Sequence, residues 1–298
     1  MIRNSLQAVL GGILVLLLSA VCPAGDDESV IISYESAVGL VEKWLAAEYP
    51  TPIAREVATE PLLEIVRDKG VPDNKKLEKM LKAFPGAFSS LVADIRQKAE
   101  GGEAQAQYRL GRCYDTGFAV AEDKDAAVRW YRKAAEQGVA LAQCNLGVCY
   151  ANGYGVAQDK AAAVRWYRTA AEQGLAEAQY NLGVCYADGV GVAEDKAAAV
   201  RWYRKAAEQG YALAQFNLGV CYANGFAVAE DKAAAVRWYR KAAEQGVALA
   251  QFNLGVCYDD GVGVAEDKAA AVRWYRKAAE QGYAPAKRAL SELGYEVR

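Results

Sequence analysis

The chain has 298 residues, 53% of them hydrophobic, and is long enough to bury a sizeable core. Its 35 Lys and Arg residues nearly balance its 37 Asp and Glu residues, so no basic excess supports nucleic-acid binding. Histidine is absent, which excludes His-dependent catalytic triads and His-containing zinc sites. We expect neither a cofactor nor a metal ion.

The first 24 residues, Met1 to Ala24, have the pattern of a signal peptide. Arg3 follows the amino terminus, and an apolar run from Ala8 to Val21 precedes small residues suited to cleavage. Glycines interrupt this run, which is short for a membrane span. We predict cleavage after Ala24 and an exported protein, either periplasmic or secreted. Lipidation at Cys22, or an uncleaved anchor, is the alternative.

Residues 25–102 have no internal period and are predicted to be mostly helical. Prolines divide this region, because a proline ends the helix before it and suits the first turn of the next. The last predicted helix ends like the second half of the repeat described next, and we expect it to cap the first repeat. The earlier helices are either further degenerate repeats or a small separate domain. The expected helices are Ser36–Tyr49, Pro61–Lys69, Asn74–Phe84 and Phe88–Glu100.

Residues 103–282 consist of five repeats of 36 residues, marked by Trp130 and by a tryptophan every 36 residues thereafter. A fixed period in this range indicates stacked two-helix units. In the third repeat we predict helix A over Ala176–Ala187 and helix B over Asp195–Gln209, with Asp195 as the N-cap. Gly210 is predicted to end helix B with a left-handed residue. Residues 283–298 form a half repeat that caps the C-terminal end.

The third repeat reads A-x-A-Q-x-x-L-G-x-x-Y-x-x-G-x-G-V-x-x-D-x-x-x-A-x-x-W-Y-x-K-A-A-E-Q-G from Ala176 to Gly210. This pattern resembles the Sel-1-like repeat, a relative of the tetratricopeptide repeat. The resemblance implies an all-α fold, a right-handed α-solenoid of two-helix repeats. It also implies an adaptor or scaffold that binds other proteins or peptides and has no catalytic activity. Bacterial members are commonly envelope or secreted proteins.

Cysteines recur once per repeat, and a sixth repeat-region cysteine, Cys144, replaces an aromatic residue of helix A. Equivalent residues of stacked repeats lie about 10 Å apart, beyond the roughly 7 Å between Cα atoms that a disulfide allows. We therefore interpret the repeated cysteines as buried thiols that pack as small hydrophobic residues. Cys144 is predicted to lie on another face, and it is the thiol whose reactivity we would test.

A partner surface is predicted on helix A, on the concave side of the solenoid. Opposite the buried Leu182 on the helical wheel, an aromatic position and a valine lie one turn apart, beside a row of asparagines suited to an extended peptide. The alternative is that these aromatic residues pack between repeats. The candidate residues are Tyr108, Tyr180, Phe216, Phe252, Asn145, Asn181, Asn217, Asn253, Val184 and Val220.

Positions that vary between the copies are secondary candidates for contact with a partner. They lie at the start of helix A and in the loop that follows it. The most variable sets are Val139, Leu175, Tyr211 and Val247; Leu141, Glu177, Leu213 and Leu249; and Tyr154, Val190, Phe226 and Val262.

Two other function classes remain open on the sequence. A cysteine-rich branch of the resembled family is associated with β-lactam binding or hydrolysis, and its repeats contain two cysteines each. Most repeats of this chain contain one, and repeated contexts offer no unique nucleophile or acid–base pair. A regulator of an inner-membrane sensor is the other alternative, which an export signal permits.

Overall fold

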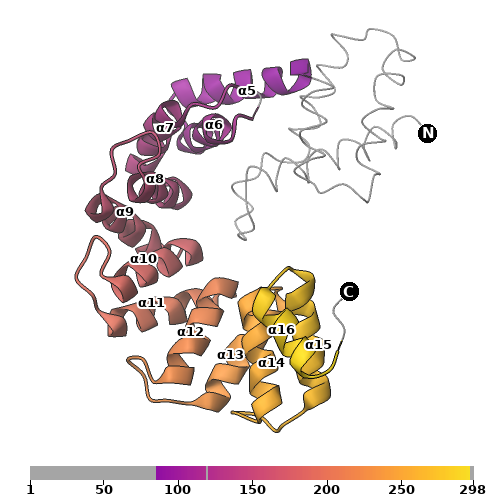
Figure 1. Ribbon diagram of the computed structural model, residues 1–298. Helices are drawn as coiled ribbons and strands as arrows, with labels where there is room; N and C mark the ends of the chain where they lie inside the picture. The colour runs from indigo at the N-terminus through magenta and orange to yellow at the C-terminus, as the bar shows by residue number, and fades with distance from the viewer. Residues whose placement is uncertain (1–84, 119, 296–298) are drawn as a thin grey trace, which may run out of the picture. The chain divides into compact units, whose positions relative to one another are not determined.

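The computed structural model describes residues 85–118 and 120–295, which form twelve α-helices and no strand (Figure 1). The signal peptide and the three helices predicted before Pro85 lie outside the described residues. The helices are α5 (Pro85–Glu100), α6 (Ala104–Thr116), α7 (Lys124–Glu136), α8 (Ala140–Asn152), α9 (Lys160–Glu172), α10 (Ala176–Asp188), α11 (Lys196–Glu208), α12 (Ala212–Asn224), α13 (Lys232–Glu244), α14 (Ala248–Asp260), α15 (Lys268–Glu280) and α16 (Ala284–Glu292).

The even-numbered helices from α6 to α14 are helix A of the five repeats, and the odd-numbered helices from α7 to α15 are helix B. The chain divides into two compact parts, and the boundary falls in the second repeat, after Ala142. In the N-terminal part, α5 packs on α6 and α6 on α7. In the C-terminal part, each helix from α9 to α16 packs on the next. The expected all-α solenoid of two-helix repeats is confirmed.

Side chains and glycines define the ends of the helices as the repeat pattern predicts. The Asp195 carboxylate accepts a hydrogen bond of 2.8 Å from the backbone N–H of Ala198, which confirms the predicted N-cap. The equivalent aspartate in each of the other four repeats accepts the same hydrogen bond. Helix A of the third repeat ends at Gly189, whose φ of 66° lies in the left-handed region. The first helix begins at Pro85, three residues before the predicted start.

The interior of each repeat forms where helix A meets helix B through a glycine. In the third repeat Leu182 is fully buried, and a Cβ added to the adjacent Gly183 would lie 2.7 Å from ring atoms of Tyr203. No such contact is tolerated between real atoms, so only glycine lets this ring lie flat against helix A. Tyr186, predicted on the buried face, is only half-buried because its hydroxyl accepts a 2.8 Å hydrogen bond from Arg168 of the preceding repeat.

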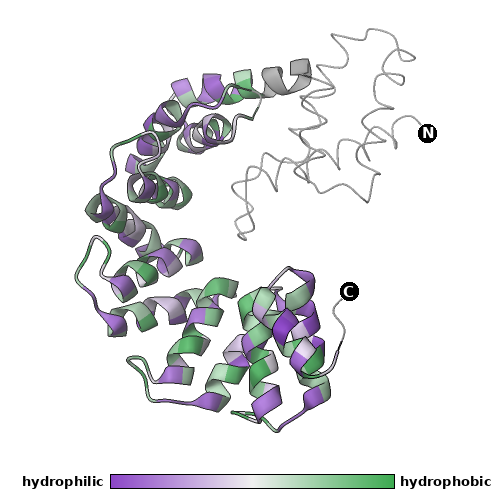
Figure 2. Cartoon of the chain, in the orientation of Figure 1, coloured by the Kyte–Doolittle hydropathy of each residue, from purple (hydrophilic) through white to green (hydrophobic). Residues whose placement is uncertain are grey.

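Apolar and polar residues are intermixed along the helices of the repeats (Figure 2). In the third repeat, helix B buries one face, which includes Ala199, Tyr203 and Ala206. None of the described helices is both long enough and apolar enough to cross a membrane.

Candidate functional site

A buried glutamine of helix A links the repeat to the preceding helix B at four positions, a role that the sequence analysis did not predict. Gln215 of α12 is 4% exposed, and its Nε2 donates to the carbonyl of Ala207, at the end of the preceding helix B, at 3.1 Å. Its Oε1 accepts from Nε2 of Gln245, at the end of its own helix B, at 2.7 Å. Both glutamines recur in all five repeats, and that recurrence was the signal available in the sequence. The pairs are Gln107–Gln137, Gln143–Gln173, Gln179–Gln209, Gln215–Gln245 and Gln251–Gln281.

The predicted aromatic series lies at the junction between repeats. The Tyr180 ring centroid is 6.0 Å from that of Tyr203 in its own repeat and 5.3 Å from that of Tyr211 in the next. Phe216 and Phe252 are half-buried in the same way, with ring centroids 5.9 and 5.6 Å from the tyrosine of their own helix B. Tyr108 is 1% exposed and offers no surface to a partner. These rings therefore pack between repeats and leave only their outer edges accessible.

The predicted valines and asparagines surround these rings. Val184 and Val220 are half-buried and pack against the core of the following junction. The asparagine amides are engaged inside the protein: Asn181 Nδ2 lies 3.8 Å from the Cys144 thiol, and Asn253 forms a hydrogen bond with the Tyr239 hydroxyl. Asn217 bonds in the same way to tyrosine hydroxyls of the preceding repeat, and Asn145 is half-buried. The amides thus order the junction.

The cysteines of the repeats are reduced thiols, and those of the first four repeats are buried. Burial raises the pKa of Cys113 to about 12 and that of Cys185 to about 11, so both thiols are neutral near pH 7. Cys144 is completely buried, and burial raises its pKa as well. Cys144 occupies the helix A position of the aromatic series, and its burial shields the thiol that we would have tested for reactivity. Cys257 is the half-buried thiol among the described cysteines, and in the described residues no acidic or thiol cluster could hold a metal ion.

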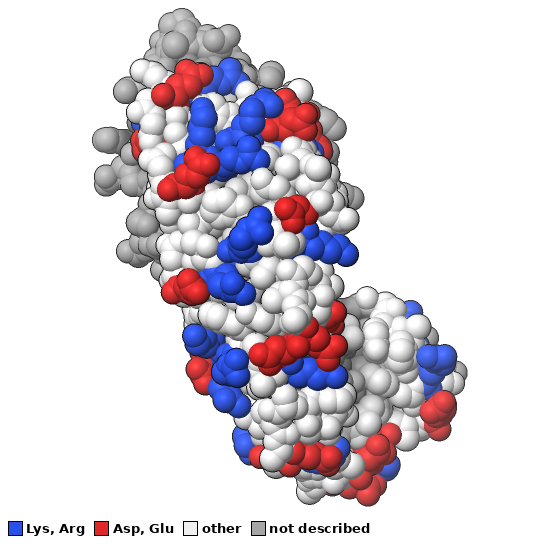
Figure 3. Space-filling view, turned by 90° about the vertical axis from the view of Figure 1, so that its left-hand side faces the viewer, with Lys and Arg blue, Asp and Glu red and all other residues white. Residues whose placement is uncertain are grey.

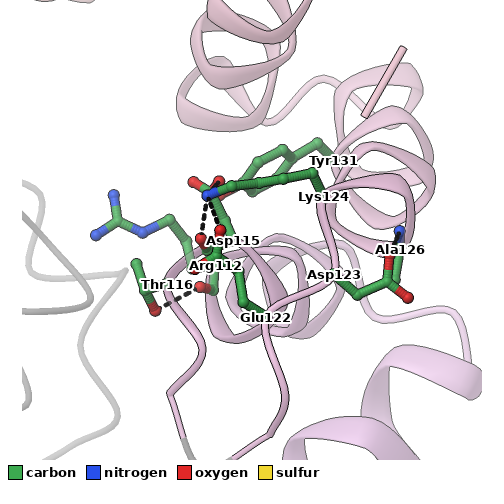
Figure 4. Close-up of polar contacts among 8 residues, drawn as sticks. All are labelled: Arg112, Asp115, Thr116, Glu122, Asp123, Lys124, Ala126 and Tyr131. Carbon is green, nitrogen blue, oxygen red and sulfur yellow. Dashed lines mark hydrogen bonds and ion pairs between the residues drawn. The ribbon is translucent and has the colours of Figure 1, made fainter. Parts of the chain in front are cut away.

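A charged cluster joins the two helices of the first repeat (Figure 4). Lys124 Nζ lies 3.0 Å from Oδ1 of Asp115 and 3.1 Å from Oε1 of Glu122. The Tyr131 hydroxyl donates to Asp115 Oδ2 at 3.0 Å. Burial opposes the charge of Lys124, but the hydrogen bonds to the two carboxylates raise its pKa, while burial raises the pKa of Tyr131.

The same cluster recurs in the fifth repeat, where Lys268 lies 2.9 Å from Asp259. Repeats 2 to 4 have alanine at the aspartate position. The cluster therefore fastens helix A to helix B in the first and last repeats.

Accessible apolar residues lie at the variable positions rather than in the aromatic series. Leu213 and Leu249, at the start of α12 and α14, are 42% and 47% exposed. Phe226 and Val262, in the loops after these helices, are 48% and 40% exposed. Helices α10, α12 and α14 contain no Lys or Arg. On the face shown in Figure 3, basic and acidic groups are interspersed and form no patch of one sign.

The fold and this surface define the class of protein as an α-solenoid assembled from two-helix repeats. The chain belongs to the Sel1 repeat family, whose Sel1 repeat matches residues 104–139, 140–175, 176–211, 212–247 and 248–283. Sel1 repeat proteins generally mediate protein–protein interactions. Among curated proteins, none shows significant similarity to the chain.

Two solved structures are similar to this chain. One is c5321, a protective antigen of uropathogenic Escherichia coli strains that displays an SLR fold; it is 36% identical over 72% of this chain, with a TM-score of 0.65. The match spans 50% of that antigen's chain. The other is a Sel1 repeat protein from Oxalobacter formigenes, 36% identical over 73% of this chain and 82% of its own, with a TM-score of 0.60.

Proposed function

We propose that the protein is an exported scaffold that binds an extended segment of another protein across helices A of its C-terminal repeats. The observation that carries this proposal is the pair Leu213 and Leu249. Both are large aliphatic side chains exposed by more than two fifths, and they occupy the same position in adjacent repeats. A regular row of this kind presents apolar contacts at the spacing of the repeats, which is how solenoids bind extended chains.

The charges near this row favour one kind of segment. Helices α10 and α14 contain acidic residues, including Glu177 and Asp260, and none of the three helices α10, α12 and α14 contains a basic residue. Like charges placed together at an interface are costly, so an acidic segment is disfavoured. The preferred ligand is an uncharged or basic segment with aliphatic or aromatic side chains.

Export is part of the proposal and rests on two supports. The first is the signal-peptide pattern of Met1 to Ala24. The second is the similarity to c5321, a protective antigen, because an antigen that confers protection must be accessible to the immune system. Fractionation of cells that express the full chain, with an antibody to the repeats, tests this part separately. Protein found only in the cytoplasm would contradict export.

Binding is tested with a library of unstructured peptides. We expect peptides selected by the full chain to bind at least tenfold more weakly to the double variant Leu213→Ser and Leu249→Ser. The matched control changes Ala197 and Ala233, exposed alanines of helix B, to serine. If the parent selects no peptides, or if both variants bind them as the parent does, the helix A surface is not the binding site.

A further inference from the structure

A cavity of about 160 Å³ lies between the fourth and fifth repeats. Its wall is contributed by α12, α13, α14 and the loop after α14, all in the C-terminal part of the chain. Most of the lining is apolar, and the polar groups are one ammonium, one amide, one hydroxyl and one thiol. The lining residues are Ala223, Lys232, Ala235, Tyr239, Asn253, Val256, Cys257 and Val262.

The preceding junction shows what this space accommodates. There the loop residue equivalent to Val262 is Phe226, and the helix B residue equivalent to Lys232 is Lys196. Lys196 Nζ lies 5.9 Å from the centroid of the Phe226 ring, within reach of a cation–π interaction. The cysteine of that junction, Cys221, is 8% exposed, whereas Cys257 is half-buried. The chain itself thus provides an aromatic ring beside the lysine at one junction and only a valine at the next.

The polar groups of the cavity are already engaged, which defines the charge of a suitable occupant. Lys232 Nζ donates to the carbonyl of Ala223 at 2.5 Å and pairs with Glu230 at 3.2 Å. Asn253 is bonded to the Tyr239 hydroxyl. An anion or cation placed here would find no unused partner of opposite charge. A neutral aromatic ring, by contrast, offers the Lys232 ammonium its negative face and the rest of the lining an apolar surface.

We propose that this cavity is a specificity pocket that receives one aromatic side chain of the bound segment. Its volume matches that of a cavity known to hold benzene, about 150 Å³. This inference rests on the proposed function, since it assigns an aromatic residue to the segment that helices A bind. The pocket would then select among segments that the exposed leucines alone would not distinguish.

The test uses benzyl alcohol as the probe and the Cys257 thiol as the reporter, in the full chain. Alkylation by iodoacetamide is followed by mass spectrometry of the tryptic peptide 242–268, which contains Cys257. We expect saturating benzyl alcohol to slow alkylation of Cys257 at least threefold and to leave Cys221, in peptide 206–232, unaffected. Cyclohexylmethanol, which has the same number of carbon atoms but a puckered ring without a π-face, should protect several-fold less.

The matched variants are Val262→Phe, which supplies the ring that Phe226 supplies at the preceding junction, and Val190→Phe, at an equivalent loop position of another repeat. Val262→Phe should abolish protection by benzyl alcohol, and Val190→Phe should retain it. Absence of protection in the parent overturns the pocket. Equal protection by the two alcohols overturns the preference for an aromatic group. The parent measurement decides both points even if a variant fails to fold.

Failure of the pocket and failure of the proposed function are distinguishable. The alcohol experiment requires no partner, and the peptide selection requires no pocket. If peptides are selected but Cys257 is not protected, the helix A surface binds without the pocket. If Cys257 is protected but no peptide is selected, the cavity binds an aromatic group unrelated to a protein partner, and the inference made here is overturned.

Discussion

The loops of the fourth and fifth repeats differ at two adjacent residues, whereas the helices on either side are nearly identical. The fourth loop contains Phe226 and Ala227, and the fifth contains Val262 and Gly263. Ala227 adopts a φ of 52° and Gly263 a φ of 73°, so both loops have a left-handed residue at this position. The residue before it is free to vary, and its size decides whether the adjacent space is filled.

The interior of the repeats shows the opposite behaviour. The glycine of helix A that faces the helix B tyrosine, and the two paired glutamines, are the same in all five copies. Their neighbours leave no room and no unsatisfied polar group, so substitutions there must distort the junction. Stability should accordingly fall steeply for changes in the interior and little for changes in the loops.

The largest expected effect comes from Gly219→Ala, in the interior. The added Cβ would lie 2.7 Å from ring atoms of Tyr239, closer than real Cβ contacts, so the ring or the helix must shift. We expect a loss of about 2–3 kcal/mol in the free energy of unfolding, the upper range for overpacking. Urea denaturation followed by circular dichroism measures it. In a Tyr239→Leu background the same substitution should cost much less, and an equal cost there would show that the ring is not the obstacle.

The next effect comes from Gln215→Ala, which removes the link between the third and fourth repeats. The carbonyl of Ala207 loses its buried donor and Gln245 loses its acceptor. We expect a loss of about 1–3 kcal/mol, the usual cost of leaving a buried polar group without a partner. Gln245→Ala, which changes an exposed residue, should cost less. A Gln215→Ala protein as stable as the parent would contradict the role assigned to the pair.

A smaller effect, of opposite sign, is expected from Ala227→Gly in the fourth loop. The left-handed conformation costs an alanine about 1–2 kcal/mol, partly offset by the greater flexibility of glycine in the unfolded chain. We expect a net gain of up to about 1 kcal/mol. The reverse change, Gly263→Ala, should destabilise, because its Cβ would lie 2.3 Å from the carbonyl oxygen of Lys232. The melting temperatures of the Ala227→Gly and Gly263→Ala variants test this prediction. An Ala227→Gly protein less stable than the parent would show that the left-handed backbone of Ala227 is not strained.

The last effect is absent at neutral pH and appears in alkaline solution, where buried cysteines and tyrosines of the interior lose their protons. Burial raises the pKa of Cys185 from 9.0 to about 11 and that of Tyr239 from 10.0 to about 12. Because the unfolded chain releases these protons at lower pH, stability is constant below pH 9 and falls from pH 9 to 12. Thermal melts across this range measure the loss. Tyr239→Phe should reduce it, and an unchanged profile in that variant would exclude this tyrosine as a cause.

Most of the fold could be predicted from the sequence, because a 36-residue period repeats the same local signals five times. The apolar spacing, the aspartate caps and the terminal glycines define the helices to within one residue in the third repeat. The paired glutamines could not be predicted from one repeat, since an isolated glutamine on a helix resembles a solvated residue. Gln215 and Gln245 lie 30 residues apart, and only the packing of three helices brings them together.

The sequence left two alternatives open for the aromatic series, for a related physical reason. A helical wheel of helix A separates the side that contains Leu182 from the opposite side. In a stack of repeats, however, the opposite side packs against the next repeat. Tyr180 and Val184 therefore pack at a junction, and Cys144, in the same position as Tyr180, is completely buried. Two of the three variable sets contain exposed apolar residues such as Leu213 and Phe226, whereas the third, which includes Val139 and Tyr211, packs against the core.

The glutamine pairs also bear on how such a chain can change its length during evolution. Removing residues 211–246 would place Gln251 opposite Ala207 in place of Ala243, and both alanines end an identical stretch of helix B. The new junction would reproduce the glutamine hydrogen bond of the old one. Gain or loss of one whole repeat thus leaves the glutamine hydrogen bonds between repeats unchanged. Selection can then change the length of the solenoid by one repeat at a time.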